Sequence, residues 1–333
     1  MECMTKIEAA RQEYADWCQA VGIDTIEKLN ETLLAGNAIE LINLCEARQE
    51  RKYAQTADQI YWGRKRKKIV MMSGPSSSGK TSSSLRIAQQ ARVLGLNPKV
   101  IELDNYFVNR ENTPVDKDGK PDFEALEAMD VKFLNSQLCD LLAGKEIELP
   151  TFDFSKGCRT FNGKKMKLEA NDMLFMEGIH ALNPALTPDI DQDRIFHVYI
   201  SALSSLPGGE KVHSSTTDKR LLRRIVRDNR VRGISPEENI LRWPSVRRGE
   251  TKNIFPFEEK ANVVFNSSTL YDLPLLKYYA EPLLCGISVS SPAYSKAQSL
   301  LKFLEVVQPL KPAEIAAIPP TSIMREFIGG QTL

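Results

Sequence analysis

The chain has 333 residues, of which 42% are hydrophobic and 26% are charged, and its formal net charge is +1. This length is enough for one good-sized domain plus an appendage, and the composition is typical of a soluble globular protein. No apolar run reaches the roughly 18 residues of a membrane-spanning helix, and the polar start lacks the core of a signal peptide. The near-neutral charge argues against a nucleic-acid partner.

Six cysteines are scattered along the chain without a CxxC pair, and there are only three histidines. This pattern argues against a zinc site and is typical of thiols in a reducing cytosol. We therefore expect a cytoplasmic protein without a membrane partner. The sequence leaves the oligomeric state open, a homo-oligomer included.

Residues 1–62 have apolar positions at helical spacing, for example Ile26, Leu29 and Leu33. We predict a helical appendage over 1–62. The basic run from Arg64 to Lys68 that follows is interpreted as a solvated lead-in to the first strand, with phosphate contact as the alternative.

Residues 74–81 match the P-loop pattern GxxxxGK[ST]. They follow the apolar run 69–72 and precede a predicted helix over 81–94, the context that the motif needs. Backbone N–H groups of such a loop surround a phosphate chain. Lys80 would contact the β- and γ-phosphates and the Thr81 hydroxyl would bind Mg²⁺. The predicted nucleotide-binding residues are Gly74, Pro75, Ser76, Ser77, Ser78, Gly79, Lys80, Thr81 and Ser82. The alternative is a serine-rich turn that matches by chance.

Strands and helices alternate after the P-loop, which indicates an α/β fold with a parallel sheet flanked by helices. Predicted strands cover 69–73, 99–103, 173–176, 195–200 and 262–265. Predicted helices cover 81–94, 124–143, 218–232, 270–280 and 293–306. Residues 147–168 are predicted to form a small β-hairpin over the edge of the sheet. We divide the chain into the appendage (1–62), a core domain (63–285) and a C-terminal helix with a proline-rich tail (286–333).

Two acids follow predicted strands directly. Asp104 ends the run 100–103, and Glu177 ends the run 173–176. Ligands of open α/β sheets bind at the carboxyl ends of the strands. Asp104 could therefore accept a proton from an attacking hydroxyl, and Glu177 could hold Mg²⁺ directly or through water. The alternative is that each acid caps the next turn.

Arginines recur at i, i+3, i+4 and i+7 within the predicted helix 218–232, at positions 220, 223, 224 and 227. Leucine, isoleucine and valine occupy the other face. Because Asp228 is the one local counter-charge, we predict a lid in which these guanidinium groups bind the triphosphate. A solvated basic face is the alternative.

These motifs together resemble the uridine kinase family, a branch close to phosphoribulokinase, over roughly residues 68–275. The matching segments are GPSSSGKT (74–81), LDNYF (103–107), DFEALEAMD (122–130), PTFDF (150–154), FMEGIHAL (175–182) and RLLRRIVRDNRVRG (220–233). The resemblance implies that residues 63–285 form a P-loop kinase domain that uses ATP and Mg²⁺.

The resemblance also implies roles for individual residues. Asp104 would be the general base, and Glu177 would be the metal-linked acid beside Thr81. Arg227 and Arg232 would bind the nucleotide. The implied substrate residues are Glu124, which would bind the ribose, Phe107, Phe152 and Arg224.

The ends of the chain are similar to a bacterial subgroup of long uridine-kinase-like proteins, in which TGS and threonyl-tRNA-synthetase-like modules precede the kinase domain. Residues 1–62 resemble their helical connector, and residues 318–330 resemble their terminus. The sequence leaves open whether the chain is a natural short form or a piece of a longer protein.

Three positions depart from the family pattern. Phe152 replaces a tyrosine, Gly157 aligns near a base-reading histidine, and Ile234 stands where many members have a further lid arginine. The acceptor is therefore less defined than the phosphoryl transfer.

We expect a kinase that phosphorylates a primary hydroxyl, with the 5′-OH of uridine or cytidine as the best fit. One alternative is a kinase of the same fold acting on a sugar phosphate or a pantothenate-like alcohol. A second is a nucleotide-sensing module of low turnover that serves an RNA-linked partner. The sequence contains no NKxD motif of GTPases and no LSGGQ-like segment of ABC ATPases.

Overall fold

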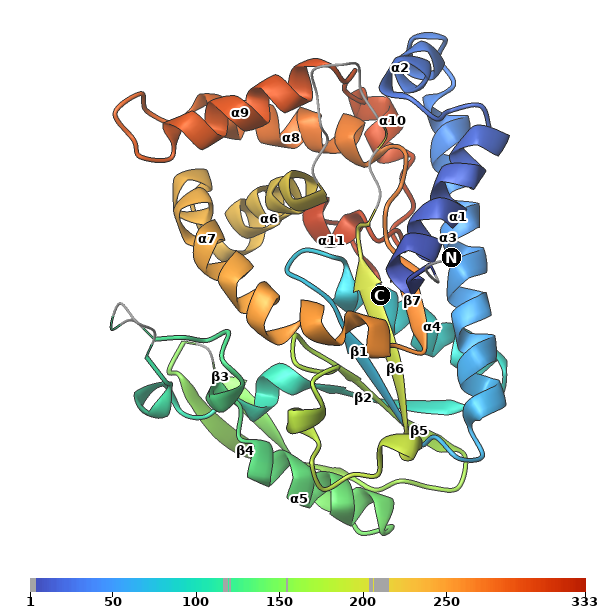
Figure 1. Cartoon of the computed structure of the whole chain (residues 1–333), viewed down its shortest axis with the longest axis vertical. Helices are drawn as coiled ribbons and strands as arrows, with labels where there is room; N and C mark the ends of the chain where they lie inside the picture. Colours follow the sequence, from blue (N-terminus) through green and yellow to red (C-terminus); the bar gives the residue numbers. More distant parts are fainter. Residues whose placement is uncertain (1–3, 116–118, 120, 154, 204–205, 207–215) are drawn as a thin grey trace.

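A five-stranded parallel sheet forms the centre of the computed structural model, which describes residues 4–115, 119, 121–153, 155–203, 206 and 216–333. Its strands lie in the order β2-β5-β1-β6-β7, and every neighbouring pair is parallel (Figure 1). The strands are β1 (Ile69–Ser73), β2 (Asn97–Glu102), β5 (Asp172–Glu177), β6 (Ile195–Ser201) and β7 (Val263–Asn266). The predicted parallel sheet flanked by helices is confirmed.

Both faces of the sheet are covered, which explains why its central strands are continuous apolar runs. Along β1, Val70 and Met72 pack against α3 (Ala38–Gly63) and α4 (Lys80–Val93). The alternate residues Ile69 and Met71 lie on the opposite face with α5 (Val131–Leu142). The carboxyl ends of β1, β2 and β5 therefore meet at one edge, where a ligand site is expected.

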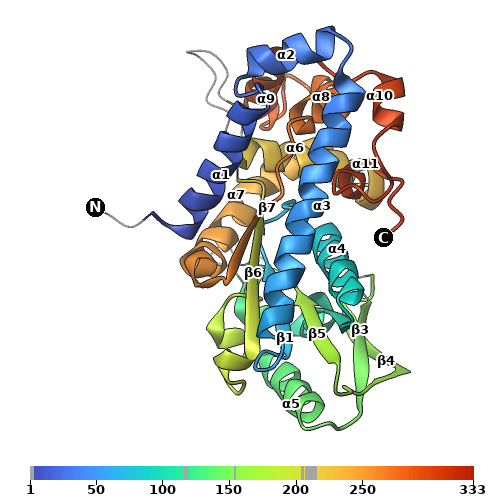
Figure 2. The same ribbon diagram turned by 90° about the vertical axis from the view of Figure 1, so that its right-hand side faces the viewer.

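The N-terminal residues are helical as predicted, in α1 (Lys6–Ala20), α2 (Ile26–Leu34) and α3. Thr5 caps α1 in a capping box with Glu8, and Thr25 caps α2. Helix α3 runs along α4, and α1 lies against the edge strand β7 (Figure 2). The appendage is thus packed on the sheet, while the three-part division of the chain stays a prediction.

The hairpin predicted over 147–168 is present as β3 (Ile147–Asp153) and β4 (Cys158–Met166), paired antiparallel in a sheet of their own. The helix predicted over 124–143 is wrong in its first turns, because α5 begins only at Val131. Asp130 caps it by accepting a hydrogen bond from the Phe133 N–H at 3.1 Å. Short 3₁₀ turns occupy Leu103–Tyr106, Arg110–Asn112, Leu126–Ala128, Pro184–Leu186, Gln192–Arg194 and Phe255–Lys260.

The second half of the chain adds a group of helices above the sheet (Figure 1). They are α6 (Thr216–Arg232), α7 (Pro236–Asn253), α8 (Asp272–Cys285), α9 (Tyr294–Glu305), α10 (Pro312–Ala316) and α11 (Arg325–Ile328). They share one apolar core with α1, α2 and the start of α3. Helix α7 was not predicted, since Pro244 interrupts its pattern. Its start carries the usual signals, a Ser235 cap followed by Pro236.

A buried ionic cluster joins α6 to the start of α8. Asp272 accepts a hydrogen bond from Arg223 at 2.6 Å and lies 3.3 Å from the Lys219 ammonium. All three side chains are at most 2% exposed. Burial alone would raise the pKa of Asp272, but the two cations outweigh it and hold that pKa below its usual value. Removal of one partner from such a cluster leaves buried charge without compensation.

We expect Asp272→Ala to lower the free energy of unfolding by about 3–5 kcal/mol, because Arg223 and Lys219 would stay buried without their carboxylate. Urea unfolding followed by circular dichroism measures this. Asp140→Ala is the matched control, since its partner Lys145 is 67% exposed and such surface pairs contribute about 0–1 kcal/mol. Equal losses in the two variants would contradict the structural role of the cluster.

Candidate active site

The P-loop connects β1 to α4 at the carboxyl edge of the sheet, and α4 begins at Lys80. Close backbone packing fixes the course of the loop. A Cβ atom on Gly74 would collide with the Ile200 carbonyl, and one on Gly79 would collide with the Ile323 side chain. Gly79 also has a φ of +82°, a region that favours glycine. Both glycines of the motif are therefore required by the geometry.

The predicted metal residues Thr81 and Glu177 are brought together. The Thr81 hydroxyl donates to the Glu177 carboxylate at 3.0 Å, while the Lys80 ammonium donates to the Pro75 carbonyl at 3.2 Å. Burial raises the pKa of Glu177 to about 7, although the Lys80 charge opposes this. A hydroxyl and a carboxylate oxygen in contact form a hard oxygen pair of the kind that binds Mg²⁺ together with substrate phosphates. These residues fit that ion.

Asp104 lies beside this pair because of the strand register. Glu102 at the end of β2 is paired with Glu177 at the end of β5, and Asp104 follows in the first turn after β2. Asp104 is open to solvent, yet the surrounding protein removes enough water to raise the pKa of its carboxyl group. The Lys80 and Arg232 charges oppose that shift. A solvent-accessible carboxylate of raised pKa suits proton transfer.

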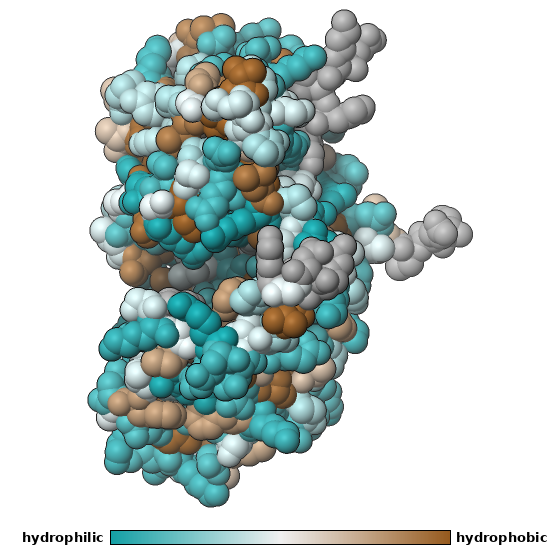
Figure 3. Space-filling model, turned by 90° about the vertical axis from the view of Figure 1, so that its left-hand side faces the viewer, coloured by the Kyte–Doolittle hydropathy of each residue, from teal (hydrophilic) through white to brown (hydrophobic). Residues whose placement is uncertain are grey.

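A hollow separates the upper helices from the hairpin region on the face shown in Figure 3. Two of the predicted substrate residues, Phe107 and Phe152, come from the lower side, whereas Arg224 belongs to α6 above it. Phe107 and Phe152 meet edge to face, with ring centroids 5.9 Å apart. Asn105 fixes their relative position, since its side-chain oxygen accepts a hydrogen bond from the Phe152 N–H at 3.0 Å. The structure therefore places two aromatic rings next to the turn that carries Asp104.

Glu124, the predicted ribose-binding acid, lies in the irregular segment before α5. Its carbonyl accepts a hydrogen bond from the Asn253 amide at 2.5 Å, and its side chain packs against Gly249 of α7. Burial raises the pKa of Glu124 to about 7, although the Arg224 charge lowers it. The two predicted substrate residues Glu124 and Arg224 are thus close enough to interact.

Gly157 closes the hairpin turn and offers no side chain to a ligand. Its φ is +70°, its N–H donates to the Asp153 carbonyl at 2.6 Å, and its carbonyl accepts from the Arg110 N–H at 2.7 Å. A Cβ atom at this position would collide with the Arg110 side chain. Both peptide groups of Gly157 are therefore used within the protein.

The arginine stripe of α6 is split, which corrects the prediction of one phosphate-binding face. Arg220 binds Glu250 through both terminal nitrogens, at 2.5 and 2.8 Å, and Arg223 binds Asp272. Both guanidinium groups are buried. The alternative of a solvated face is also wrong for these two residues, because their counter-charges come from distant parts of the chain.

Arg220 and Arg224 both contact Ser76 of the P-loop, and Arg220 does so by donating to its carbonyl at 3.0 Å. Arg224 donates to the Ser76 hydroxyl at 2.8 Å and to the Asn239 amide oxygen at 3.1 Å. Arg227 binds its neighbour Asp228 at 2.8 Å. Arg232 remains 54% exposed, and within the described part of the chain its ion pair is a long 3.7 Å contact to the same carboxylate. Arg232 therefore keeps most of its donors available for a ligand.

Glu250 is a site residue that the sequence analysis missed. This buried acid of α7 accepts the Ser76 N–H of the P-loop at 2.9 Å, in addition to its bonds with Arg220 and Arg247. Burial would raise the pKa of Glu250, but the two guanidinium groups keep it below its usual value. The missed helix α7 hid this residue, since nothing in the local pattern marks a single glutamate.

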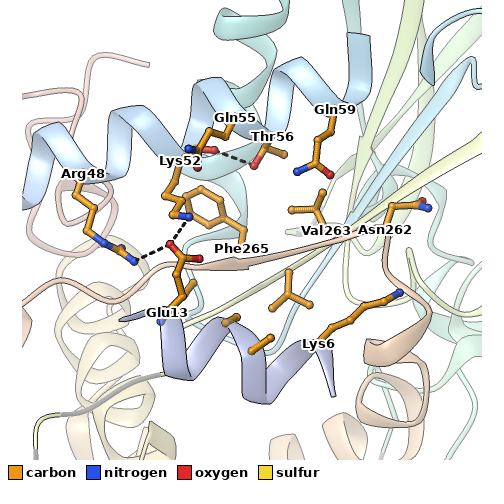
Figure 4. A pocket seen from close by; sticks show the side chains of 14 residues that line it. Lys6, Glu13, Arg48, Lys52, Gln55, Thr56, Gln59, Asn262, Val263 and Phe265 are labelled. Atoms are coloured by element: carbon orange, nitrogen blue, oxygen red, sulfur yellow. Dashed lines mark hydrogen bonds and ion pairs between the residues drawn. The ribbon is translucent and has the colours of Figure 1, made fainter. Parts of the chain in front are cut away.

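Two cavities of the protein differ in their relation to the predicted site residues. One of about 460 Å³ lies between α1, α3 and β7 and is lined by none of the predicted site residues (Figure 4). A second of about 390 Å³ lies between the end of α6 and residues 325–331, and Arg227 and Arg232 line it. The predicted nucleotide-binding arginines thus belong to the second cavity.

The fold and the site define a P-loop phosphotransferase with an alcohol acceptor. A family model described as "Phosphoribulokinase / Uridine kinase family" matches residues 69–274, more than half of the chain. The chain belongs to the phosphoribulokinase/uridine kinase family.

The chain is also similar to the following proteins. A uridine kinase of Macrococcus caseolyticus is 29% identical over 197 residues, covering 59% of this chain and 86% of its own length. A uridine kinase of Ligilactobacillus salivarius is 29% identical over 177 residues, covering 53% of this chain and 74% of its own. A solved structure described as a "Possible Uridine Kinase" from Bacillus stearothermophilus has 20% identity and a TM-score of 0.39. It covers 60% of this chain and 89% of that chain.

Among the helices that the structure describes, none combines the length and the apolar content needed to cross a membrane.

We expect nucleotide to protect the connection between α6 and α7 from trypsin, because Arg230 and Arg232 are exposed beside Gly233 and binding would order this end of α6. The measurement is the rate of cleavage at these arginines, with and without ADP, read by mass spectrometry. Exposed Lys145, between α5 and β3, provides the control site. An ADP-independent rate at all three sites would contradict a lid at this position.

Proposed function

We propose that the chain is an ATP-dependent kinase that transfers the γ-phosphoryl group to a primary hydroxyl of a small molecule. The best-fitting acceptor is the 5′-OH of uridine or cytidine, with UMP or CMP and ADP as products. The observation that carries the proposal is the meeting of Lys80, the Thr81–Glu177 pair and Asp104 at one edge of the sheet.

Each of these residues has a separate task in the proposed reaction. Thr81 and Glu177 would hold Mg²⁺, which when bound neutralises charge on the β- and γ-phosphate oxygens. Lys80 would stabilise the charge that develops as the bond between the γ-phosphorus and the bridging oxygen breaks. The acceptor oxygen forms the new bond to phosphorus, and its proton passes to the Asp104 carboxylate. Loop amides orient the phosphate chain, which limits the motion needed to reach the transition state.

The acceptor is proposed from the residues on the hairpin side. Phe107 and Phe152 can stack on a planar ring, and Glu124 can accept hydrogen bonds from ribose hydroxyls. The uridine kinases among the relatives support a nucleoside acceptor. The tyrosine and histidine that the family pattern has are here Phe152 and Gly157, and this favours a second candidate, a non-nucleoside alcohol.

The decisive experiment measures ADP release with ATP and a panel of acceptors that includes the four ribonucleosides, sugar phosphates and pantothenate-like alcohols. The proposal expects turnover with at least one of them and loss of turnover in Lys80→Ala, because the ammonium group contacts the transferred phosphate. Near-normal activity in a folded Lys80→Ala protein, or no turnover with any acceptor, would refute it.

Asp104→Asn is expected to lower kcat by about 10²–10⁴, the usual contribution of a positioned base, while ATP binding is kept. Steady-state kinetics on the best acceptor separate kcat from KM. The matched control is Asp140→Asn, which makes the same change at a surface position paired with the exposed Lys145. A change confined to KM in Asp104→Asn would identify Asp104 as a binding residue instead.

We also expect the kinase to discriminate only weakly among nucleosides with different bases. A pocket that hydrogen-bonds a base edge rejects analogues strongly, because its buried polar groups would lose their partners. Phe107 and Phe152 can only stack, and stacking accepts any base. The measurement is kcat/KM for uridine, cytidine, adenosine and guanosine under one condition. A preference for uridine above about 10³-fold would show that other polar groups read the base.

A further inference from the structure

Residues 319–331 lie on the first turn of α4, directly beyond the P-loop. The Glu326 carboxylate accepts hydrogen bonds from the Ser82 N–H at 3.2 Å and from the Ser82 hydroxyl at 2.6 Å. The Gln331 amide donates to the same hydroxyl at 2.7 Å. Ile323 packs against Gly79, so closely that a Cβ atom there would collide with it. This segment, named here the C-terminal strap, therefore contacts the residues that would surround a phosphate chain.

The C-terminal strap is anchored in the core. Met324 and Phe327 are completely buried, and the Phe327 ring lies under the Arg223 guanidinium at 5.0 Å. Arg325 donates to the Ile318 carbonyl at 3.1 Å, so its charge is used largely to tie the strap to the residues that precede it. A strap fixed in this way can form a rigid wall of a binding site.

The strap and the end of α6 enclose the cavity of about 390 Å³. That volume falls within the range of about 300–1,000 Å³ that small-molecule sites occupy. Arg230 and Arg232 line the cavity and both are exposed; Arg230 donates through Nε to the Phe327 carbonyl of the strap at 3.3 Å. Gly329 and Gly330 also line the cavity, and the Arg230 guanidinium packs so closely on Gly329 that a Cβ atom there would collide with it. Planar guanidinium groups are suited to the faces and edges of a nucleobase.

The position of the reacting end determines which part of a nucleotide can reach this cavity. In the proposed reaction Asp104 and Glu177 lie on the γ-phosphate side of the loop, and Phe152 of the hairpin is bonded to Asn105, the residue after Asp104. Because the acceptor would occupy the side of Asp104 and Phe152, the nucleoside of the phosphate donor must extend from the P-loop in another direction. Ser82 is the next residue of α4 after Thr81, and both residues that bind its hydroxyl, Glu326 and Gln331, line the cavity.

We propose that this cavity binds the nucleoside half of the phosphate donor and that the C-terminal strap forms one of its walls. The proposal rests on the proposed function for the nature of the ligand. The strap lies outside the matched residues 69–274, so it adds a nucleotide-binding element that the family match does not contain. Nucleotide binding has to displace Glu326 from the Ser82 N–H if a phosphate oxygen takes that donor.

The first test compares ADP with inorganic tripolyphosphate, which has the phosphate chain but no nucleoside. Gln331→Ala is expected to weaken ADP binding about 5- to 10-fold and to leave tripolyphosphate binding within about twofold, the scale of one lost hydrogen bond. Isothermal titration calorimetry gives both dissociation constants. Thr332→Ala is the matched control, because this exposed neighbour does not line the cavity, and it should change neither constant. Unchanged ADP binding in Gln331→Ala, or an equal loss for both ligands, would overturn the proposal.

The second test uses a cysteine as a probe of occupancy. Val231 lines the cavity and is 60% exposed, whereas Val93 at the end of α4 is 80% exposed and lies outside it. ADP should slow maleimide labelling of Val231→Cys at least about tenfold, tripolyphosphate should not, and neither should protect Val93→Cys. Mass spectrometry of the labelled peptides distinguishes these positions from the native cysteines. Equal protection by the two ligands would indicate closure around phosphate alone and would refute the nucleoside site.

These measurements use binding and not turnover. Loss of the proposed kinase activity with every acceptor, together with ADP-specific protection of Val231→Cys, would refute the proposed reaction and leave the nucleoside site in place. Turnover with a nucleoside, together with failure of both binding tests, would refute the nucleoside site and leave the proposed reaction in place.

Discussion

The Arg220–Glu250 pair is the interaction on which the geometry of the active site depends. It is buried, and it joins α6, α7 and the P-loop, because the Ser76 N–H donates to Glu250 and the Ser76 carbonyl accepts from Arg220. A lone carboxylate at this depth would be costly, and its two guanidinium partners compensate for that cost. The same pair therefore fixes the distance of α6 and α7 from the P-loop and the conformation of the loop itself. Movement of α6 or α7 would be transmitted to the phosphate-binding amides.

Three acids near the P-loop also depend on neighbouring cations, because their surroundings disfavour the charged form of a carboxyl group. Burial raises the pKa of Asp104, Glu124 and Glu177. The Lys80 charge opposes this rise at all three acids, and at Glu124 the Arg224 charge opposes it more strongly. The basic residues of α6 are thus divided between two tasks. Arg220 and Arg223 balance permanent buried acids, whereas Arg232 remains accessible. A count of charges along the chain could not separate these tasks, because the partners of Arg220 and Arg223 lie 30 and 49 residues away.

The parts of the fold that depend on local pattern were predictable from the sequence. The P-loop, the five strands and the positions of Asp104 and Glu177 at strand ends follow from apolar runs and from one motif. The start of α5 was predicted too early, since a helix-compatible composition before Asp130 does not reveal that Asp130 caps the helix. Helix α7 was missed because of Pro244, and with it Glu250. The contacts of Glu326 with Ser82 could not be predicted, because they join residues far apart in the chain and depend on the tertiary packing of α6 and α11.

The bond between Glu326 and Ser82 also bears on how the protein folds. It closes a chain segment of 244 residues, and contacts between such distant residues form late because the loss of chain entropy precedes any gain from the contact. The phosphate-binding turn would then be completed only after the sheet and the upper helices have assembled. ATP in the refolding solution would stabilise the native state without speeding the earlier steps, so that its effect would appear in the unfolding rate.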